Sequence, residues 1–140
     1  MSTVLWANRL RDGVVESDTR DKYALYRYSR KLDSVCKRSS GLSFAQLCDT
    51  TDLRVNLEDI SLPDGMSSTD ELMAREGVWQ PAEEVVRMLA AALAEIREKK
   101  MRFGLLKNEY ETVVAELEES LCYAEAAANE GAQFNFSVVM

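Results

Sequence analysis

Apolar residues recur every three to four positions over three stretches of the chain, which is the spacing that places them on one face of an α-helix. The repeats predict helices over residues 21–38, over about 82–102, and from 108 to about 129. Gly104 lies between the last two stretches and is a natural residue just beyond a helix end. We therefore expect those two stretches to form a long antiparallel helix pair, with one continuous helix as the alternative.

Two other stretches alternate apolar and polar residues, which is the pattern of a strand with one buried face. They are residues 52–58 and residues 133–139. Residues 3–12 fit a short helix that Asp12-Gly13 would end. They also fit a strand that enters an Asp-Gly turn, with Val14-Val15 opening its partner. We expect the helix, and keep the hairpin as the alternative.

Shorter signals fill the middle of the chain. Ser43 can cap a short helix over residues 43–48, and Ser68 with Glu71 fits a capping box that starts a helix ending at Glu76. Residues 61–67 form the longest predicted loop. The fold class predicted is mainly α: a single domain over residues 1–140, built around the long antiparallel helix pair, with one or two short strands including the C-terminal one.

Composition excludes several kinds of catalytic site. The chain has 140 residues, 46% of them hydrophobic, and no histidine. Ser-His-Asp and Cys-His sites and His-ligated zinc or haem are therefore absent from it. The three cysteines are widely spaced, without a CxxC pair, and none is placed at a predicted helix start that would activate a thiol. An odd cysteine count without a secretory signal predicts a reduced, cytoplasmic protein.

We expect no cofactor and no metal ligand, because the chain has no glycine-rich phosphate motif and no carboxylates at calcium-loop spacing. We also expect no membrane partner, since the longest apolar run, residues 88–94, is far shorter than the ~20 residues of a membrane span. A non-enzymatic protein is the main prediction. The enzymatic alternative would use a carboxylate- or lysine-based site, for instance among Asp49, Asp52 and Lys31.

The net charge of −7 is unevenly placed. Residues 108–140 contain seven glutamates and no lysine or arginine. Such a region repels phosphate backbones and attracts cationic partners, so we do not expect nucleic-acid binding there. We predict a partner-binding surface on this stretch, formed by Glu109, Tyr110, Glu116, Glu119 and Tyr123. The simpler interpretation is a solvated helix face that keeps the protein soluble.

Two further surfaces each have two possible roles. Residues 99–102 with Lys107 form a small basic patch, which either binds phosphate or complements the helix dipole. The alanine-rich helix over residues 82–102 would allow close helix packing, and hence an oligomeric scaffold or a homodimer.

Several strings give the chain a resemblance to known sequences. These are Ala24-Leu25-Tyr26, Lys31-Leu32-Asp33, Thr51-Asp52-Leu53, Ala74-Arg75-Glu76-Gly77-Val78-Trp79 and the final Phe134-Asn135-Phe136-Ser137-Val138-Val139-Met140. They resemble small uncharacterised bacterial proteins, some encoded near polymorphic or contact-dependent toxins and suspected to be immunity proteins. None of the strings is a catalytic motif, so no functional residue is carried over. The resemblance implies a stoichiometric cytoplasmic inhibitor, acidic because many toxin domains are cationic nucleases.

Overall fold

A central β-sheet organises the chain, in a computed structural model that describes residues 2–58 and 60–140. The described strands are β1 (Val4–Arg11), β2 (Val14–Lys22), β3 (Cys48–Asp49), β4 (Gln80–Pro81) and β5 (Gln133–Val139). Their order is β2-β1-β5-β3, with β4 also paired to β5. β5 runs antiparallel to β1 and β4 and parallel to β3. The last strand of the sequence is therefore the central strand of the sheet.

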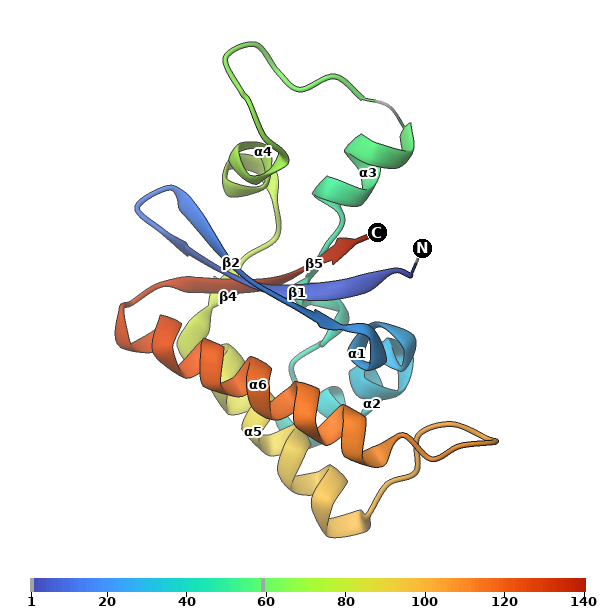
Figure 1. The fold of residues 1–140 in the computed structure, drawn as a ribbon. Helices are drawn as coiled ribbons and strands as arrows, with labels where there is room; N and C mark the ends of the chain where they lie inside the picture. Colours follow the sequence, from blue (N-terminus) through green and yellow to red (C-terminus); the bar gives the residue numbers. More distant parts are fainter. Residues whose placement is uncertain (1, 59) are drawn as a thin grey trace.

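Helices cover both faces of this sheet (Figure 1). They are α1 (Tyr23–Arg27), α2 (Ser29–Ser40), α3 (Thr51–Glu58), α4 (Thr69–Glu76), α5 (Ala82–Lys99) and α6 (Tyr110–Asn129), with a 3-10 turn η1 (Ala45–Leu47). α1, α2, α5 and α6 lie on one face, whereas α3 and α4 lie on the other (Figure 1). The structure is 54% helical and 20% strand, an α+β fold. The prediction of a mainly α fold is wrong.

The N-terminal hairpin accounts for much of that error. Residues 3–12, expected as a helix, form β1, and the hairpin kept as the alternative is the correct structure. Asp12 and Gly13 have φ of 52° and 76°, as the two central residues of a tight hairpin turn require. β1 also pairs with β5, with Leu5 opposite Val138. β1 is buried on both faces, at Val4, Leu5, Ala7 and Asn8, so its sequence lacks the alternation of a half-buried strand.

The strand expected over residues 52–58 is also wrong, because these residues form α3. The helix starts where the Asp49 carboxylate accepts the Thr51 N–H, at 2.9 Å, and Asp52 lies in its first turn, where the helix dipole favours an acid. Leu57 is 62% exposed. The alternating leucines and valine of this stretch therefore do not define a buried face.

Other local predictions are confirmed, with shifted boundaries. α5 and α6 form the antiparallel pair (Figure 1), but α5 ends at Lys99, before Gly104 is reached, and the next residue, Lys100, adopts a left-handed conformation. The helix expected over residues 21–38 is interrupted at Tyr28 and becomes α1 and α2. The Ser68 hydroxyl caps α4 by accepting the Glu71 N–H. β5 has the predicted bounds.

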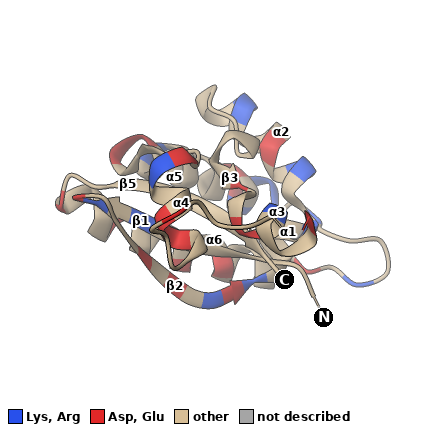
Figure 2. Cartoon of the chain, turned by 90° about the horizontal axis from the view of Figure 1, so that it is seen from above, with Lys and Arg blue, Asp and Glu red and all other residues tan. Residues whose placement is uncertain are grey.

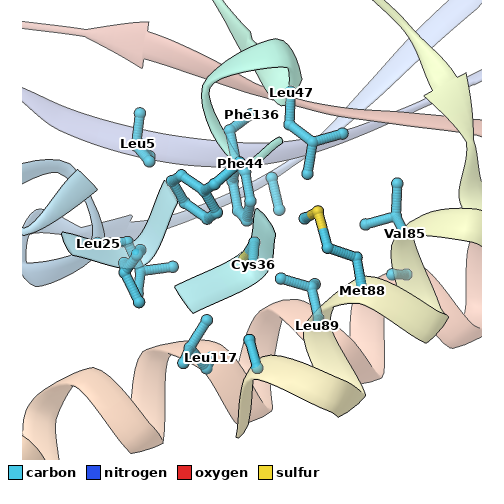
Figure 3. Close-up of a cluster of buried hydrophobic side chains, with 14 of the residues drawn as sticks. Leu5, Leu25, Cys36, Phe44, Leu47, Val85, Met88, Leu89, Leu117 and Phe136 are labelled. Carbon is cyan, nitrogen blue, oxygen red and sulfur yellow. The ribbon is translucent and has the colours of Figure 1, made fainter. Parts of the chain in front are cut away.

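The hydrophobic core lies between the sheet and the helices α2, α5 and α6 (Figure 3). Phe44 and Phe136 are completely buried there, with ring centroids 5.4 Å apart. Cys36 lies among them, as predicted, and burial raises the pKa of its thiol to about 12. A thiol that stays protonated at neutral pH is a packing residue.

Candidate functional site

Glu116, one of the five residues predicted to contact a partner, points into the protein. It is 7% exposed, and its Oε1 accepts the backbone N–H groups of Ala24 and Leu25, at 3.0 and 3.1 Å. These N–H groups are otherwise unpaired donors at the start of α1, so Glu116 satisfies that helix end from α6. Burial raises the pKa of its carboxyl to about 6.

Glu109 is also turned inward. Its carboxylate accepts hydrogen bonds from the hydroxyls of Tyr23, at 2.9 Å, and of Tyr28, and the Arg27 guanidinium is 3.8 Å away. The hydrogen bond from Tyr28, followed by that from Tyr23, lowers the pKa of Glu109. This carboxylate ties the start of α6 to α1.

Glu119 belongs to a charged network with β2. It pairs with Arg20 at 2.9 Å and with Lys22 at 3.7 Å. The Lys22 side chain is completely buried, also contacts Asp18 at 3.3 Å, and donates to the Arg20 carbonyl at 2.8 Å. The network therefore holds α6 against β2. Figure 2 shows basic residues in blue and acidic residues in red next to one another along β2.

The two predicted aromatic contacts are part of the fold as well. The Tyr123 hydroxyl donates to the Glu16 carbonyl at 2.8 Å, and its ring packs edge-on against Phe134. Tyr110 is half-buried against the core. Four of the five residues thus lie on α6 and Glu109 immediately precedes it, but most of their polar atoms already have partners inside the protein.

The rest of the acidic helix is largely neutralised too. Glu118 pairs with Arg97, and Glu130 pairs with Arg9 and Arg11. Within residues 2–58 and 60–140, Glu111 and Glu125 are the exposed α6 glutamates without an ion-pair partner. The basic partners lie on β1, β2 and α5, distant in sequence from α6, so a local charge count does not include them. The partner-binding role of the five residues stays a prediction.

Uncompensated acidity lies instead on the opposite face of the sheet. Residues 49–76, termed the α3–α4 segment, contain eight acidic residues and two arginines. The single ion pair of its described residues, Arg75 with Glu76, is internal to the segment. Figure 2 looks down onto this layer, with α3 and α4 in front of the sheet. A cationic partner would meet net negative charge here.

A cleft of about 270 Å³ lies between this segment and the sheet. Asp52 and Asp70 line it, each from the first turn of its helix. The Thr69 hydroxyl donates to Asp52 Oδ1 at 2.7 Å and holds the two helix starts together. Burial, and then the charge of Asp52, raises the pKa of Asp70. Among the described residues, no lysine or arginine is paired with either carboxylate.

A buried polar network supports the floor of this cleft. The Asn8 amide donates to Asn135 Oδ1 and to Ser137 Oγ, both at 2.9 Å, and the Ser17 hydroxyl donates to Asn8 Oδ1 at 2.5 Å. Asn135 in turn donates to the Val78 carbonyl at 2.9 Å. Because these hydrogen bonds fix the side chains, Ser17 and Ser137 present a rigid polar floor to the cleft.

The cleft is suited to a cationic side chain. Met73, Val139 and Trp6 give it apolar walls for an aliphatic stem, and Asp52 with Asp70 can receive an ammonium or guanidinium group. Among the described residues, no group of three His, Cys, Asp or Glu side chains is arranged to hold a metal ion.

The residues of the enzymatic alternative do not come together as expected. Both Asp49 oxygens accept backbone N–H groups, from Thr51 at 2.9 Å and Val78 at 2.8 Å. Lys31 donates to the Arg102 carbonyl, beside the ring of Phe103 on the other face of the sheet. Asp52 is therefore the member of that set that lines the cleft.

Asp70 was not predicted as a site residue. The charge of the α3–α4 segment was visible in the sequence, but its place opposite the sheet required the fold. Comparison with protein-family models, with curated proteins and with solved structures finds no match for this chain. Among the described helices, none combines the length and the apolar character that a bilayer crossing requires.

Proposed function

We propose that the protein is a non-enzymatic binding module that takes a cationic protein partner at the α3–α4 cleft and inhibits it stoichiometrically. The partner class fits the resemblance to immunity proteins, whose targets include cationic toxin domains. The observation that carries the proposal is the pair Asp52 and Asp70, two carboxylates that line one cleft without a cation of the described chain beside them.

Two properties of the cleft support a protein partner. The floor is held by buried hydrogen bonds, so it needs little rearrangement on binding. The surrounding acidic segment would speed association with a basic surface and make the association sensitive to salt. A partner arginine or lysine entering the cleft would be the anchor of the interface.

The first test uses a hexa-arginine peptide as the probe, with binding measured by isothermal titration calorimetry. Asp52→Asn/Asp70→Asn is the test variant, and Glu111→Gln/Glu125→Gln is the matched control, because it removes the same charge from α6. We expect saturable 1:1 binding whose affinity decreases with added salt. The affinity should fall at least tenfold in the test variant alone, because each variant removes charge from one acidic surface. Equal losses in both variants would contradict a site at the cleft.

The second test concerns inhibition. Wild-type protein and both variants serve as baits in cell extract, and mass spectrometry identifies a protein retained by wild type and control but not by the test variant. That protein is then purified and assayed with increasing amounts of the chain. We expect its activity to be lost at one equivalent. Binding without loss of the partner's activity would support the binding module but would contradict the proposed inhibition.

A further inference from the structure

Two adjacent leucines are almost completely exposed in the connection between α5 and α6. Leu105 is 95% exposed and Leu106 is 101% exposed. They lie in residues 100–109, termed the leucine loop, which projects from the body of the protein (the orange loop in Figure 1). Single exposed leucines are ordinary, but two neighbouring ones at the end of a projection mark a contact surface.

The loop is held in place rather than loosely attached. The Arg102 guanidinium donates to the carbonyls of Gly104, at 2.8 Å, and Leu105, at 3.0 Å. Asn108 Oδ1 accepts the Phe103 N–H at 3.0 Å, and the buried Phe103 ring anchors this end of the loop in the core. Gly104 has φ of 101°, and a Cβ on it would lie 2.4 Å from the Lys107 carbonyl oxygen. Internal bonds therefore fix how the leucines are displayed.

Positive charge surrounds the base of the loop. Arg27 and Lys107 line the hollow beside the leucines, Arg102 lies within the loop, and Lys31 donates to the Arg102 carbonyl. The carboxylate that faces them, Glu109, accepts hydrogen bonds from two tyrosines and lies 3.8 Å from Arg27. The result is an apolar tip with a cationic rim.

We propose that the leucine loop inserts into the surface of an anionic lipid bilayer. The boundary between headgroups and acyl chains accommodates a small convex apolar projection such as this tip of two leucines. The cations around its base are then placed among anionic headgroups. The acidic α3–α4 segment is on the face of the sheet opposite the helices that carry the loop (Figure 1).

The expectation of no membrane partner rested on the absence of a membrane span, and the attachment proposed here does not need a span. A span needs ~20 apolar residues, but shallow insertion needs only a few apolar side chains supported by basic neighbours. The chain supplies both, as Leu105, Leu106 and the basic patch over residues 99–102 with Lys107. Insertion of the loop does not depend on occupation of the cleft.

The test is co-sedimentation with vesicles of phosphatidylcholine alone and of phosphatidylcholine mixed with phosphatidylserine. The variant is Leu105→Ser/Leu106→Ser, and the matched control is Leu57→Ser, which changes an exposed leucine on α3. We expect wild type and control to bind the mixed vesicles and the loop variant to bind roughly a hundredfold more weakly. Lys107→Glu should weaken binding about fivefold or more, and added salt should weaken it further.

Three results would overturn the proposal. The loop variant could bind as well as wild type, neutral vesicles could be bound as well as anionic ones, or neither vesicle could be bound. In the last case, light scattering measures whether the protein self-associates. Self-association of wild type that is lost only in the loop variant would show that the leucines contact a second copy of the chain. Because these leucines are exposed, the unfolding midpoint of each variant should match wild type. Asp52→Asn/Asp70→Asn should bind vesicles like wild type, which separates this inference from the proposed function.

Discussion

Two acidic regions of this protein differ in what their charge does. On α6 and the residues after it, Glu116, Glu119 and Glu130 each accept hydrogen bonds or ion pairs from β1, β2 or α1. In the α3–α4 segment, Asp52 and Asp70 line a cleft without a paired cation among the described residues. The first region pairs its acids mainly with cations and helix N–H groups of other elements, whereas the second leaves Asp52 and Asp70 without a paired cation among the described residues.

The difference shows why a run of glutamates in a sequence does not identify a binding surface. Residues 108–140 carry no basic residue, so the charge count treated every glutamate there as exposed. Their partners Arg9, Arg20 and Lys22 come from the first two strands. Ion pairs across a sheet and a helix join residues about a hundred positions apart, and local charge counts cannot include them.

The largest expected effect is on the network around Lys22. Asp18→Ala removes the nearer carboxylate partner of a completely buried ammonium, and we expect the free energy of unfolding to fall by about 3–5 kcal/mol, because only Glu119, at 3.7 Å, then balances this buried charge. Urea unfolding at neutral pH measures it. Lys22→Met in the same background should recover much of the loss. A change below 1 kcal/mol would show that the network contributes little.

The Asp18 carboxyl should also make the stability of the fold sensitive to acid. The hydrogen bond from Arg20 is the main cause that lowers the pKa of Asp18 to about 2, below its ordinary value of 3.8. Its contribution to stability is therefore present above pH 4 and is lost as the pH falls through 2. Urea unfolding of wild type should show this decline, and the Asp18→Ala variant should show a smaller one.

A smaller effect is expected at Glu116. Glu116→Ala leaves two backbone donors of α1 unpaired, and we expect a loss of about 1–3 kcal/mol in urea unfolding. Glu116→Gln keeps an oxygen acceptor and should lose much less. Equal losses for both variants would contradict the capping role.

The pKa of Glu116 predicts a pH dependence of stability opposite to that expected from Asp18. Its pKa is raised to about 6 from the ordinary 4.5, so the folded protein binds this proton more tightly than the unfolded chain does. The stabilisation is complete below pH 4.5 and is lost as the pH rises through 6. Urea unfolding across this range should show less decline in Glu116→Gln than in wild type. The same slope in both proteins would assign it to another group.

The smallest effects on stability are expected at the carboxylates without ion pairs. Asp70→Asn and Glu111→Gln should each leave the free energy of unfolding within about 0.5 kcal/mol of wild type, since neither removes an ion pair of the described residues. Thermal melts of the purified variants measure this. A loss comparable to that of Asp18→Ala at either site would remove the contrast between the two regions.

The parts of the fold that local sequence determines were predictable. The α5–α6 pair, the Ser68 cap and β5 follow from periodicity and capping within one element. The strand β1 was not, because it is buried on both faces and lacks alternation, and its pairing with β5 joins the two ends of the chain. The cleft shares this property: Trp6, Asp52 and Ser137 meet only once three distant segments have packed. Asp52 was considered from sequence for a different chemistry, an enzymatic site.

The most direct test of the contrast is an NMR titration of uniformly ¹⁵N-labelled protein with the hexa-arginine peptide. We expect the amides of Asp52, Thr69, Asp70 and Ser137 to shift most, those of Glu111, Glu118 and Glu125 to shift little, and added salt to reverse the shifts. If the largest shifts instead follow the exposed face of α6, the acidic surface available to a partner is the one first predicted from the sequence, and the contrast between the two regions is contradicted.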